Sequence, residues 1–545
     1  MEEKDEKRSF IKGTFVLAIA QLISKVLGAV YRIPLYLLIG SEGIGLVQMA
    51  YPVYSTVLAL STAGIPVAIS KVVAEKLAKG HRAGAYKAFQ VSLGILAVTG
   101  ASFSLALFLS ARYVAETVSK DPRAYYPLLA ISPAIFFVAV MSAFRGFFQG
   151  QQDMVPTAIS QVLEQILRVG TMFLLAFLLM DRGVEYAAAG ATFGAVTGAI
   201  GGLAFLYIVY RRRLDLSRVA VYAPDGDSSV IGLLKEIIAL AIPISLASIV
   251  MPIIQLIDMA VVPGRLQAGG ASVAQATTMY GQLSGGAIPL INLPTVFTAA
   301  LATSLVPSIS SAFALRNLRL VSHRVALATR LTMIMVLPSA FGLLVLAEPI
   351  GGFLFDDPGI GVPLEMLAPG VIFIGLQMTT SGILQGLGRT TVPLKTLSTG
   401  AVTKLFFTWF LTPRLGIRGA ALSSVAGFFV ASALNYAAVL RYTGRPEDLA
   451  GAFLKPLFAS AVMSFVARAS HVRLLGLTGR GWISVPGAIV AAVLVYLAVL
   501  TVIGGLKPSD LEAIPRVGPA MSRTLGRLLD KRIGGKKGKK GRGEG

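Results

Sequence analysis

Residues 481–505, GWISVPGAIVAAVLVYLAVLTVIGG, form an apolar segment without a single charged side chain. A helix needs about 20 apolar residues to cross the hydrocarbon core of a membrane, so this segment predicts a transmembrane helix. Comparable segments recur along the whole chain. We predict about fourteen of them, at 13–39, 44–70, 88–111, 124–150, 154–180, 185–210, 233–262, 276–311, 322–347, 363–388, 391–413, 416–440, 449–468 and 481–505.

The composition of the 545 residues agrees with a multi-pass membrane protein. Hydrophobic residues make up 55% and charged residues only 14%, whereas a soluble globular chain carries about 25% charged residues. The apolar segments leave no room for a sizeable soluble domain. The chain has no cysteine, which excludes disulfides, thiolate metal sites and cysteine nucleophiles. The three histidines, His81, His323 and His471, lie far apart in the sequence, so no histidine metal site is expected.

Lysines and arginines predict the orientation of the helices, because cytoplasmic loops are enriched in them. With both termini in the cytoplasm, the inner segments hold 35 of these residues and the outer segments hold 10. We therefore expect a multi-pass protein of the cytoplasmic membrane. Its net charge of +22 then reflects topology and attraction to anionic lipids, not nucleic-acid binding.

The chain also contains an internal repeat. Phe147-Phe-Gln-Gly150 precedes a helix that starts with Val155-Pro156, and Ile383-Leu-Gln-Gly386 precedes one that starts with Val392-Pro393, about 236 residues later. A repeat of six crossings returns the chain to the same side, so both copies insert in the same orientation. Two further echoes pair Pro66-Val-Ala-Ile-Ser70 with Pro307-Ser-Ile-Ser310, and Gly183 with Gly416.

The repeat and the segments together predict the fold class. We expect an all-α membrane protein with two pseudo-symmetric six-helix lobes around a central cavity, followed by a C-terminal helix pair. The predicted parts are a cytoplasmic N-terminus (1–12), an N-lobe (13–210), a cytoplasmic connector (211–232), a C-lobe (233–440), the helix pair (449–505) and a basic cytoplasmic tail (506–545).

Charged side chains inside the predicted helices are candidates for a binding site, because charge in hydrocarbon is costly. Lys25 and Arg32 lie about two turns apart on one helix face, with no acid between them. This pair predicts an anion site. The alternative is that Arg32 extends to the membrane surface while Lys25 pairs with an acid on another helix.

Two acidic residues, Glu164 and Asp258, also lie inside predicted helices and are candidates for pairing with cations. Glu164 and Arg168 are four residues apart, a spacing that permits an ion pair within one helix. Arg145, near the inner end of its segment, could contact substrate or lipid headgroups. Asp258, close to Gln255, could hold a coupling ion or balance a cation such as Arg32.

Lys404 lies midway along the predicted helix 391–413, beside Phe406, Phe407 and Trp409. It is a further candidate for the anion site. The alternative is a cation that rests on the aromatic rings.

Four stretches resemble the polysaccharide-biosynthesis transporters, and above all their stage V sporulation protein B-like group. They are Tyr31–Leu35, Gly43–Ser55 together with Leu60–Lys71, Gly146–Gly150 together with Pro156–Glu164, and Ser381–Gly388. This group is similar to the MurJ-type lipid II flippases, within the superfamily of multidrug, oligosaccharide-lipid and polysaccharide exporters.

The resemblance implies fourteen helices, alternating access and an undecaprenyl-pyrophosphate-linked glycan as substrate. It also implies cavity cations on the first helix, where Ser24-Lys25-Val-Leu-Gly28 has Lys in the place of the family's Arg. A lysine offers a point charge instead of a bidentate contact. The region Gln282–Pro294 lacks the charges that Gram-negative members carry on helix eight.

We therefore expect a flippase for a lipid-linked cell-wall or polysaccharide precursor, in peptidoglycan synthesis, sporulation or capsule export. It would not be an enzyme. No G-x-x-x-x-G-K-[ST] motif is present, so the energy would come from the membrane potential or an ion gradient and no cofactor is expected. The alternatives are a drug/cation antiporter of the same superfamily, a membrane glycosyltransferase or ligase, and a scaffold without transport activity. The basic tail would contact anionic lipids.

Overall fold

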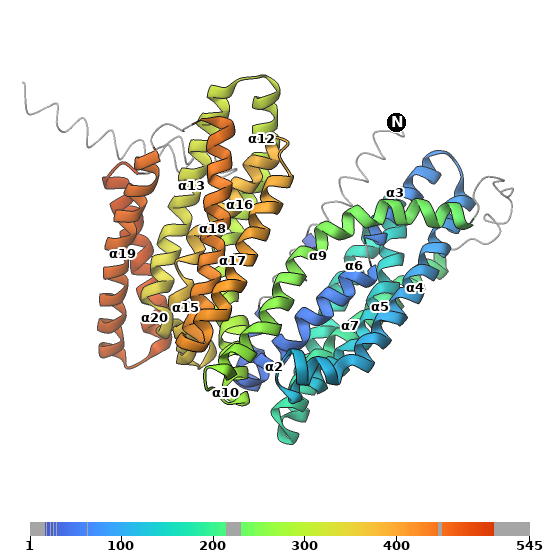
Figure 1. The fold of residues 1–545 in the computed structure, drawn as a ribbon, viewed down its shortest axis with the longest axis horizontal. Helices are drawn as coiled ribbons and strands as arrows, with labels where there is room; N and C mark the ends of the chain where they lie inside the picture. The colour runs from blue at the N-terminus through green and yellow to red at the C-terminus, as the bar shows by residue number, and fades with distance from the viewer. Residues whose placement is uncertain are drawn as a thin grey trace, which may run out of the picture. The chain divides into compact units, whose positions relative to one another are not determined.

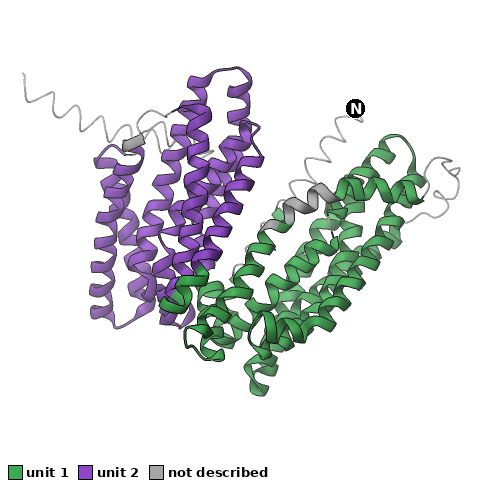
Figure 2. Ribbon diagram, viewed as in Figure 1, with its two compact units in different colours: residues 1–286, 408–417 green, residues 287–407, 418–545 purple. Residues whose placement is uncertain are grey.

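The computed structural model describes residues 30–62, 64–213, 230–444 and 449–505, with a few positions between 17 and 28. These residues form helices and no strand, which confirms the all-α prediction. Two compact units can be distinguished (Figure 2), one of residues 1–286 and 408–417, the other of residues 287–407 and 418–545. Each unit is a bundle of long helices (Figure 1).

The described part of the first unit holds eight α-helices. They are α2 (Arg32–Thr62), α3 (Ile65–Ala78), α4 (Arg82–Tyr113), α5 (Tyr125–Gly150), α6 (Val155–Leu179), α7 (Val184–Arg213), α9 (Val230–Ala268) and α10 (Val273–Gly281). Between them lie the π-helical turn η1 (Val114–Val118) and the 3₁₀ turns η2 (Pro122–Ala124) and η3 (Met180–Arg182).

The second unit begins near the π-helical turn η4 (Gln282–Ala287). Its helices are α11 (Ile288–Asn292), α12 (Thr295–Ala314), α13 (Leu318–Val345), α14 (Ala347–Phe355), α15 (Gly361–Leu367) after the 3₁₀ turn η5 (Pro358–Ile360), α16 (Gly370–Gly386), α17 (Thr391–Leu415), α18 (Ile417–Thr443), α19 (Leu449–Thr478) and α20 (Gly481–Val502). The end of α17 belongs to the first unit.

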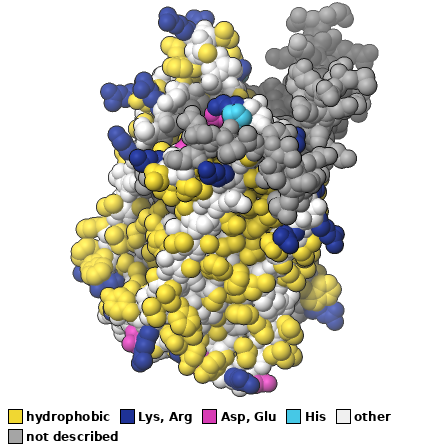
Figure 3. Space-filling model, turned by 90° about the vertical axis from the view of Figure 1, so that its right-hand side faces the viewer, with side chains coloured by type: hydrophobic (Ala, Val, Ile, Leu, Met, Phe, Trp, Pro, Cys, Tyr) yellow, Lys and Arg dark blue, Asp and Glu magenta, His cyan; other side chains and the backbone are white. Residues whose placement is uncertain are grey.

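Ten of these helices are long and apolar enough to cross a membrane, or eleven if the bent pair Pro358–Leu367 and Gly370–Gly386 is one span. On the face drawn in Figure 3, hydrophobic side chains cover the middle and most Lys and Arg lie toward the ends. Such a band is the surface that hydrocarbon requires. The described helices establish a multi-pass membrane fold, while the count of fourteen crossings stays a prediction.

Three predicted segments are broken by the backbone chemistry of Gly and Pro. The segment 44–70 ends as a helix at Thr62, and α3 starts after Gly64, whose φ of +66° is a left-handed conformation that glycine tolerates. The segment 276–311 is divided among α10, η4, α11 and α12. Prolines at 289 and 294 lack the N–H that a continuous helix needs. The segment 363–388 bends by 49° between α15 and α16.

Each unit has its own buried core. In the first unit, α3, α4, α5, α7 and α9 meet around Ile69, Phe89 and Phe147, with the rings of Phe89 and Phe147 at 4.5 Å between centroids. In the second unit, Ile309 of α12 packs with Ile383 of α16. Stacked aromatic and aliphatic side chains of this kind stabilise the bundles by burial and close packing.

The internal repeat is visible in the helix packing. A Cβ atom on Gly146 would lie 2.6 Å from the carbonyl oxygen of Pro66, and one on Gly382 would lie 2.6 Å from that of Ala302. Both glycines allow two helix backbones to approach closely. Each residue of the second pair is 236 positions after its counterpart in the first, as the repeat predicts.

The same packing corrects one predicted echo. Pro66 corresponds to Ala302, so the pairing of Pro66 with Pro307 is wrong. The two prolines have different local roles, because Pro66 opens α3 whereas Pro307 lies inside α12. The compact units also differ from the predicted lobes, since α9 and α10 contact α2 and belong to the first unit. The lobe boundaries stay a prediction.

Candidate functional site

The middle of α6 is a polar position in the interior of the first unit. Ser160, Gln161, Glu164 and Arg168 follow each other at spacings of one, three and four residues, so they share one side of the helix. The rest of α6 is predominantly apolar. A polar stripe of this kind within a membrane span indicates a cavity or a partner helix beside it.

Glu164 accepts hydrogen bonds from two arginines. Arg168 Nη2 donates to Glu164 Oε1 at 2.6 Å, and Arg145 Nη2 of α5 donates to Glu164 Oε2 at 2.9 Å. Arg145 Nε also donates to Ser160 Oγ at 3.0 Å. The sequence predicted the first contact and left open whether Arg145 lies among lipid headgroups. In the structure Arg145 contacts the polar stripe of α6.

These three side chains are largely shielded, with 16% of Arg145, 14% of Glu164 and 20% of Arg168 exposed. Two cations and one anion leave a net charge of +1. Removing such charges from water is costly unless their hydrogen bonds are satisfied. The cluster therefore favours an additional anion nearby.

Unsatisfied polar atoms surround the cluster. Arg168 Nε and Gln161 Oε1 are buried without a hydrogen-bond partner among the described residues, as is the hydroxyl of Tyr51 in α2. Tyr51 and Tyr54 both lie within electrostatic range of Arg168. Buried polar atoms without partners are rare in folded proteins and are costly to keep, so they are expected to meet a ligand or water.

The neighbouring helix α7 packs closely against α6 at the residues of the cluster. A Cβ atom on Gly198 would lie 2.6 Å from the carbonyl oxygen of Glu164, and one on Gly194 would lie 2.5 Å from that of Arg168. Because these glycines have no side chain, α7 lies against the backbone of α6 at the turns that carry the two charges.

Comparison with known proteins decides the family. A family model described as "Polysaccharide biosynthesis protein" matches residues 10–313, more than half of the chain. The chain belongs to this family. A second model, MatE, matches residues 243–410.

Two relatives from Bacillus subtilis (strain 168) match at length. Stage V sporulation protein B is 30% identical over 521 residues, covering 95% of this chain and all of the relative. Lipid II flippase MurJ is 29% identical over 457 residues, covering 80% of this chain and 83% of the relative.

Solved structures of two transporters share the fold. Lipid II flippase MurJ in an inward closed conformation matches with a TM-score of 0.63 at 15% identity, over 90% of this chain and 98% of that one. An inward-facing multidrug resistance MATE transporter of the MOP superfamily matches with a TM-score of 0.60 at 17% identity, over 79% and 98%. The chain therefore has the multi-pass membrane fold of these transporters.

Lys404 is the counterpart of Arg168 in the second unit. A Cβ atom on Gly427 of α18 would lie 2.7 Å from the carbonyl oxygen of Gly400 and 2.8 Å from Lys404 Cβ. In the first unit, Gly198 meets the carbonyl of Glu164 and the Cβ of Arg168 in the same way. Gly400 and Lys404 each lie 236 residues after Glu164 and Arg168, so the repeat places a cation at corresponding sites.

Trp409, one of the aromatic residues near Lys404 in the sequence, contacts another cation, Arg265. The guanidinium of Arg265 lies 4.3 Å from the ring centre of Trp409, and Arg265 Nε donates to the Trp409 carbonyl at 3.1 Å. Trp409 thus contacts Arg265, and the alternative that Lys404 rests on the aromatic rings stays a prediction.

The other described candidate residues make no hydrogen bond to Glu164, and one candidate lies outside the described part of the chain. Lys25 is not among the described residues. Arg32 is exposed in the first turn of α2 and lies within electrostatic range of Tyr51. Asp258 is half-buried in α9 near Tyr280 of α10, whereas Gln255 is exposed.

Sequence reasoning missed Ser160, Gln161, Tyr51 and Tyr54. For α6 the signal was available, because Gln161, Glu164 and Arg168 repeat at helical spacing in an apolar segment. For the tyrosines no such signal existed, since their approach to Arg168 depends on how α2 packs in the unit.

Proposed function

We propose that this transporter moves an undecaprenyl-pyrophosphate-linked glycan, such as a lipid II-like cell-wall precursor, across the cytoplasmic membrane by alternating access. The observation that carries the proposal is the cluster of Arg145, Glu164 and Arg168, with its net positive charge and its buried unsatisfied Nε. A pyrophosphate headgroup supplies the missing negative charge and acceptor oxygens. The name of one relative, a lipid II flippase, supports the same substrate class.

In this proposal the pyrophosphate binds to Lys25, Arg32 and Arg168, with Arg145 as a further cationic contact. Hydrogen bonds to charged groups contribute about 1.5–3 kcal/mol each. Glu164 keeps the two arginines oriented, and Asp258 with Gln255 is the candidate for ion coupling. Both termini are cytoplasmic, the basic tail contacts anionic lipids, and the membrane potential or an ion gradient drives transport.

The contacts of Glu164 also argue against the alternative function, a drug/cation antiporter. A cation-binding acid must be able to exchange its partner for a proton or a substrate cation. Glu164 has both oxygens occupied by arginines, and the cluster repels a second cation. The substrate selected by this site is therefore an anion.

The test is complementation of a bacterial strain whose own lipid II flippase can be depleted. The wild-type chain should restore growth, and a Lys25→Ala, Arg32→Ala double variant at equal abundance should not. Lys25→Arg should retain function, because it restores the guanidinium of related sequences. Normal growth with the double variant would contradict the proposed anion site, and failure of the wild-type chain would exclude lipid II as a substrate.

A further inference from the structure

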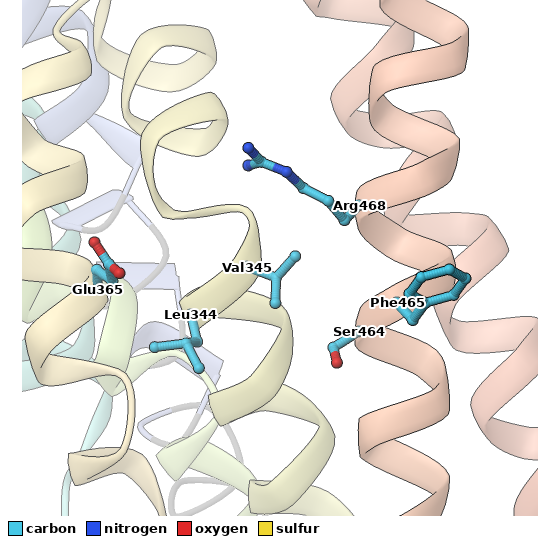
Figure 4. A pocket seen from close by; sticks show the side chains of 6 residues that line it. All are labelled: Leu344, Val345, Glu365, Ser464, Phe465 and Arg468. Atoms are coloured by element: carbon cyan, nitrogen blue, oxygen red, sulfur yellow. The ribbon is translucent and has the colours of Figure 1, made fainter.

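A second polar site lies in the other unit, away from the cluster on α6. A groove of about 470 Å³ opens between α13, α15 and α19 (Figure 4). Its volume falls in the range of about 300–1,000 Å³ that small-molecule sites occupy. The lining residues are Leu344, Val345, Glu365, Ser464, Phe465 and Arg468.

The groove has one anion and one cation on separate helices. Glu365 comes from α15 and Arg468 from α19, and Figure 4 shows the Arg468 side chain extending from α19 toward the α13 side. Both are exposed, and the described ion pairs do not join them to each other or to a third residue. Each charge is therefore available to a ligand.

The position of Arg468 makes an ordinary surface charge a poor explanation. It lies ten residues before the end of α19 at Thr478, which corresponds to about 15 Å along the helix. Residues Gly451–Thr478 form one of the candidate membrane spans. A charge within a membrane span normally faces a cavity or a partner.

Of the remaining lining residues, Ser464 is polar and three are apolar. Leu344 and Val345 end α13, and Phe465 is 77% exposed on α19. Hydrocarbon chains can lie along these side chains. The groove thus combines a surface for acyl chains with two opposite charges.

We propose that this groove binds a phospholipid of the phosphatidylethanolamine class. Arg468 contacts the lipid phosphate through its guanidinium fork, and Glu365 accepts hydrogen bonds from the primary ammonium. A lipid with a phosphate but no amine would leave Glu365 without a partner in an apolar setting, which is costly. The proposal concerns a resident lipid and does not rest on the identity of the transported substrate.

The experiment follows thermal unfolding of the purified full-length protein in detergent during titration with short-chain lipids. Phosphatidylethanolamine should raise the melting temperature at about tenfold lower concentration than phosphatidylglycerol, which lacks the amine. It should also bind about tenfold more tightly than phosphatidylcholine, whose trimethylated ammonium cannot donate an N–H to Glu365. This comparison uses the wild-type chain and needs no variant to fold.

Substitutions assign the two contacts. Glu365→Gln should lower the affinity for phosphatidylethanolamine about tenfold and leave that for phosphatidylglycerol unchanged, while Arg468→Gln should weaken both. The matched controls are Glu348→Gln on α14 and Arg473→Gln on α19, which do not line the groove. Equal affinity of the wild type for the three lipids, or an unchanged preference in Glu365→Gln, would overturn the proposal. Lower stability without any change in lipid affinity would mean that the two charges only support the fold.

Discussion

Arg168 donates one hydrogen bond from Nη2 to Glu164, while its buried Nε has no partner among the described residues. If this guanidinium binds a pyrophosphate, Arg168→Ala should reduce transport at least tenfold, because a charged contact contributes about 1.5–3 kcal/mol. Protein abundance should stay near normal, since Arg145 still neutralises Glu164. The measurement is substrate flux normalised to the amount of protein in the membrane.

The control for this variant is Arg112→Ala. Arg112 pairs with Glu116 at the same spacing of four residues, but 80% of its side chain is exposed. Exposed pairs contribute about 0–1 kcal/mol, so flux and abundance should both be unchanged. If Arg168→Ala instead lowered abundance and spared the flux per molecule, the cluster would be structural only.

Part of this cluster follows from the sequence. The spacing of Glu164 and Arg168 predicts their contact, because residues four apart lie on one helix face. The contribution of Arg145 could not be predicted, since it requires knowing how α5 crosses α6. The role of Lys404 as the counterpart of Arg168 follows from the repeat, but only the glycine contacts of the structure fix the register.

At the scale of helices, α7 approaches α6 at Gly198. An added Cβ would lie 2.6 Å from the carbonyl oxygen of Glu164, closer than non-bonded atoms allow. Gly198→Ala should therefore separate the helices and destabilise the protein by about 1–3 kcal/mol, measured by thermal unfolding in detergent. As a control, Gly170→Ala in α6 meets no atom within 4 Å and should stabilise the helix by about 0.5–1 kcal/mol. Equal effects of the two variants would contradict this packing.

A second contact between elements involves the turn η2. Asp121 is fully buried, and its carboxylate accepts hydrogen bonds from Arg123 Nη2 at 2.8 Å and from Thr277 Oγ1 of α10 at 2.6 Å. Arg123 Nη1 also donates to Glu42 of α2 at 2.5 Å. These bonds join α2, η2 and α10.

Asp121→Asn keeps the shape of this side chain but removes its charge. We expect it to destabilise the protein by about 1–3 kcal/mol, because Arg123 loses one of its two acidic partners. Thr277→Val removes one hydrogen bond and should cost about 1 kcal/mol. Unfolding curves of both variants provide the measurement, and a melting temperature of Asp121→Asn equal to that of the wild type would show that the network does not stabilise these helices.

The predicted helices agree with the structure where apolar segments are continuous and differ where Gly or Pro interrupts them. The segment at 154–180 corresponds closely to α6 (Val155–Leu179). In contrast, hydrophobicity alone does not reveal the break at Gly64, because the residues on both sides are apolar. The left-handed φ at this glycine divides one predicted segment into α2 and α3.

At the scale of the whole molecule, the repeat could be predicted from the sequence. Its glycines recur because both copies need them where two helices pack closely. Gly150 and Gly386 occupy equivalent contacts, against the carbonyl oxygens of Ser70 and Val306. The assignment of α9 and α10 to the first compact unit was not predictable, since it depends on contacts with α2 that no local pattern specifies.

The orientation of the chain is open to a direct test. The excess of Lys and Arg on one side predicts that both termini are cytoplasmic. Reporter fusions after Lys12 and after Leu506 should both be active inside the cell, as an even number of crossings requires. One active fusion inside and one outside would exclude the predicted fourteen crossings.

Transport of the lipid-linked substrate itself tests the central claim most directly. The purified chain is placed in liposomes with a fluorescent undecaprenyl-pyrophosphate-linked disaccharide, and its movement between leaflets is followed by a membrane-impermeant quencher, with and without a membrane potential. We predict that the wild type moves this lipid and that Arg168→Ala moves it at least tenfold more slowly. A wild-type chain that leaves the lipid in place, but exchanges a cationic drug for protons in the same liposomes, would contradict the proposed function.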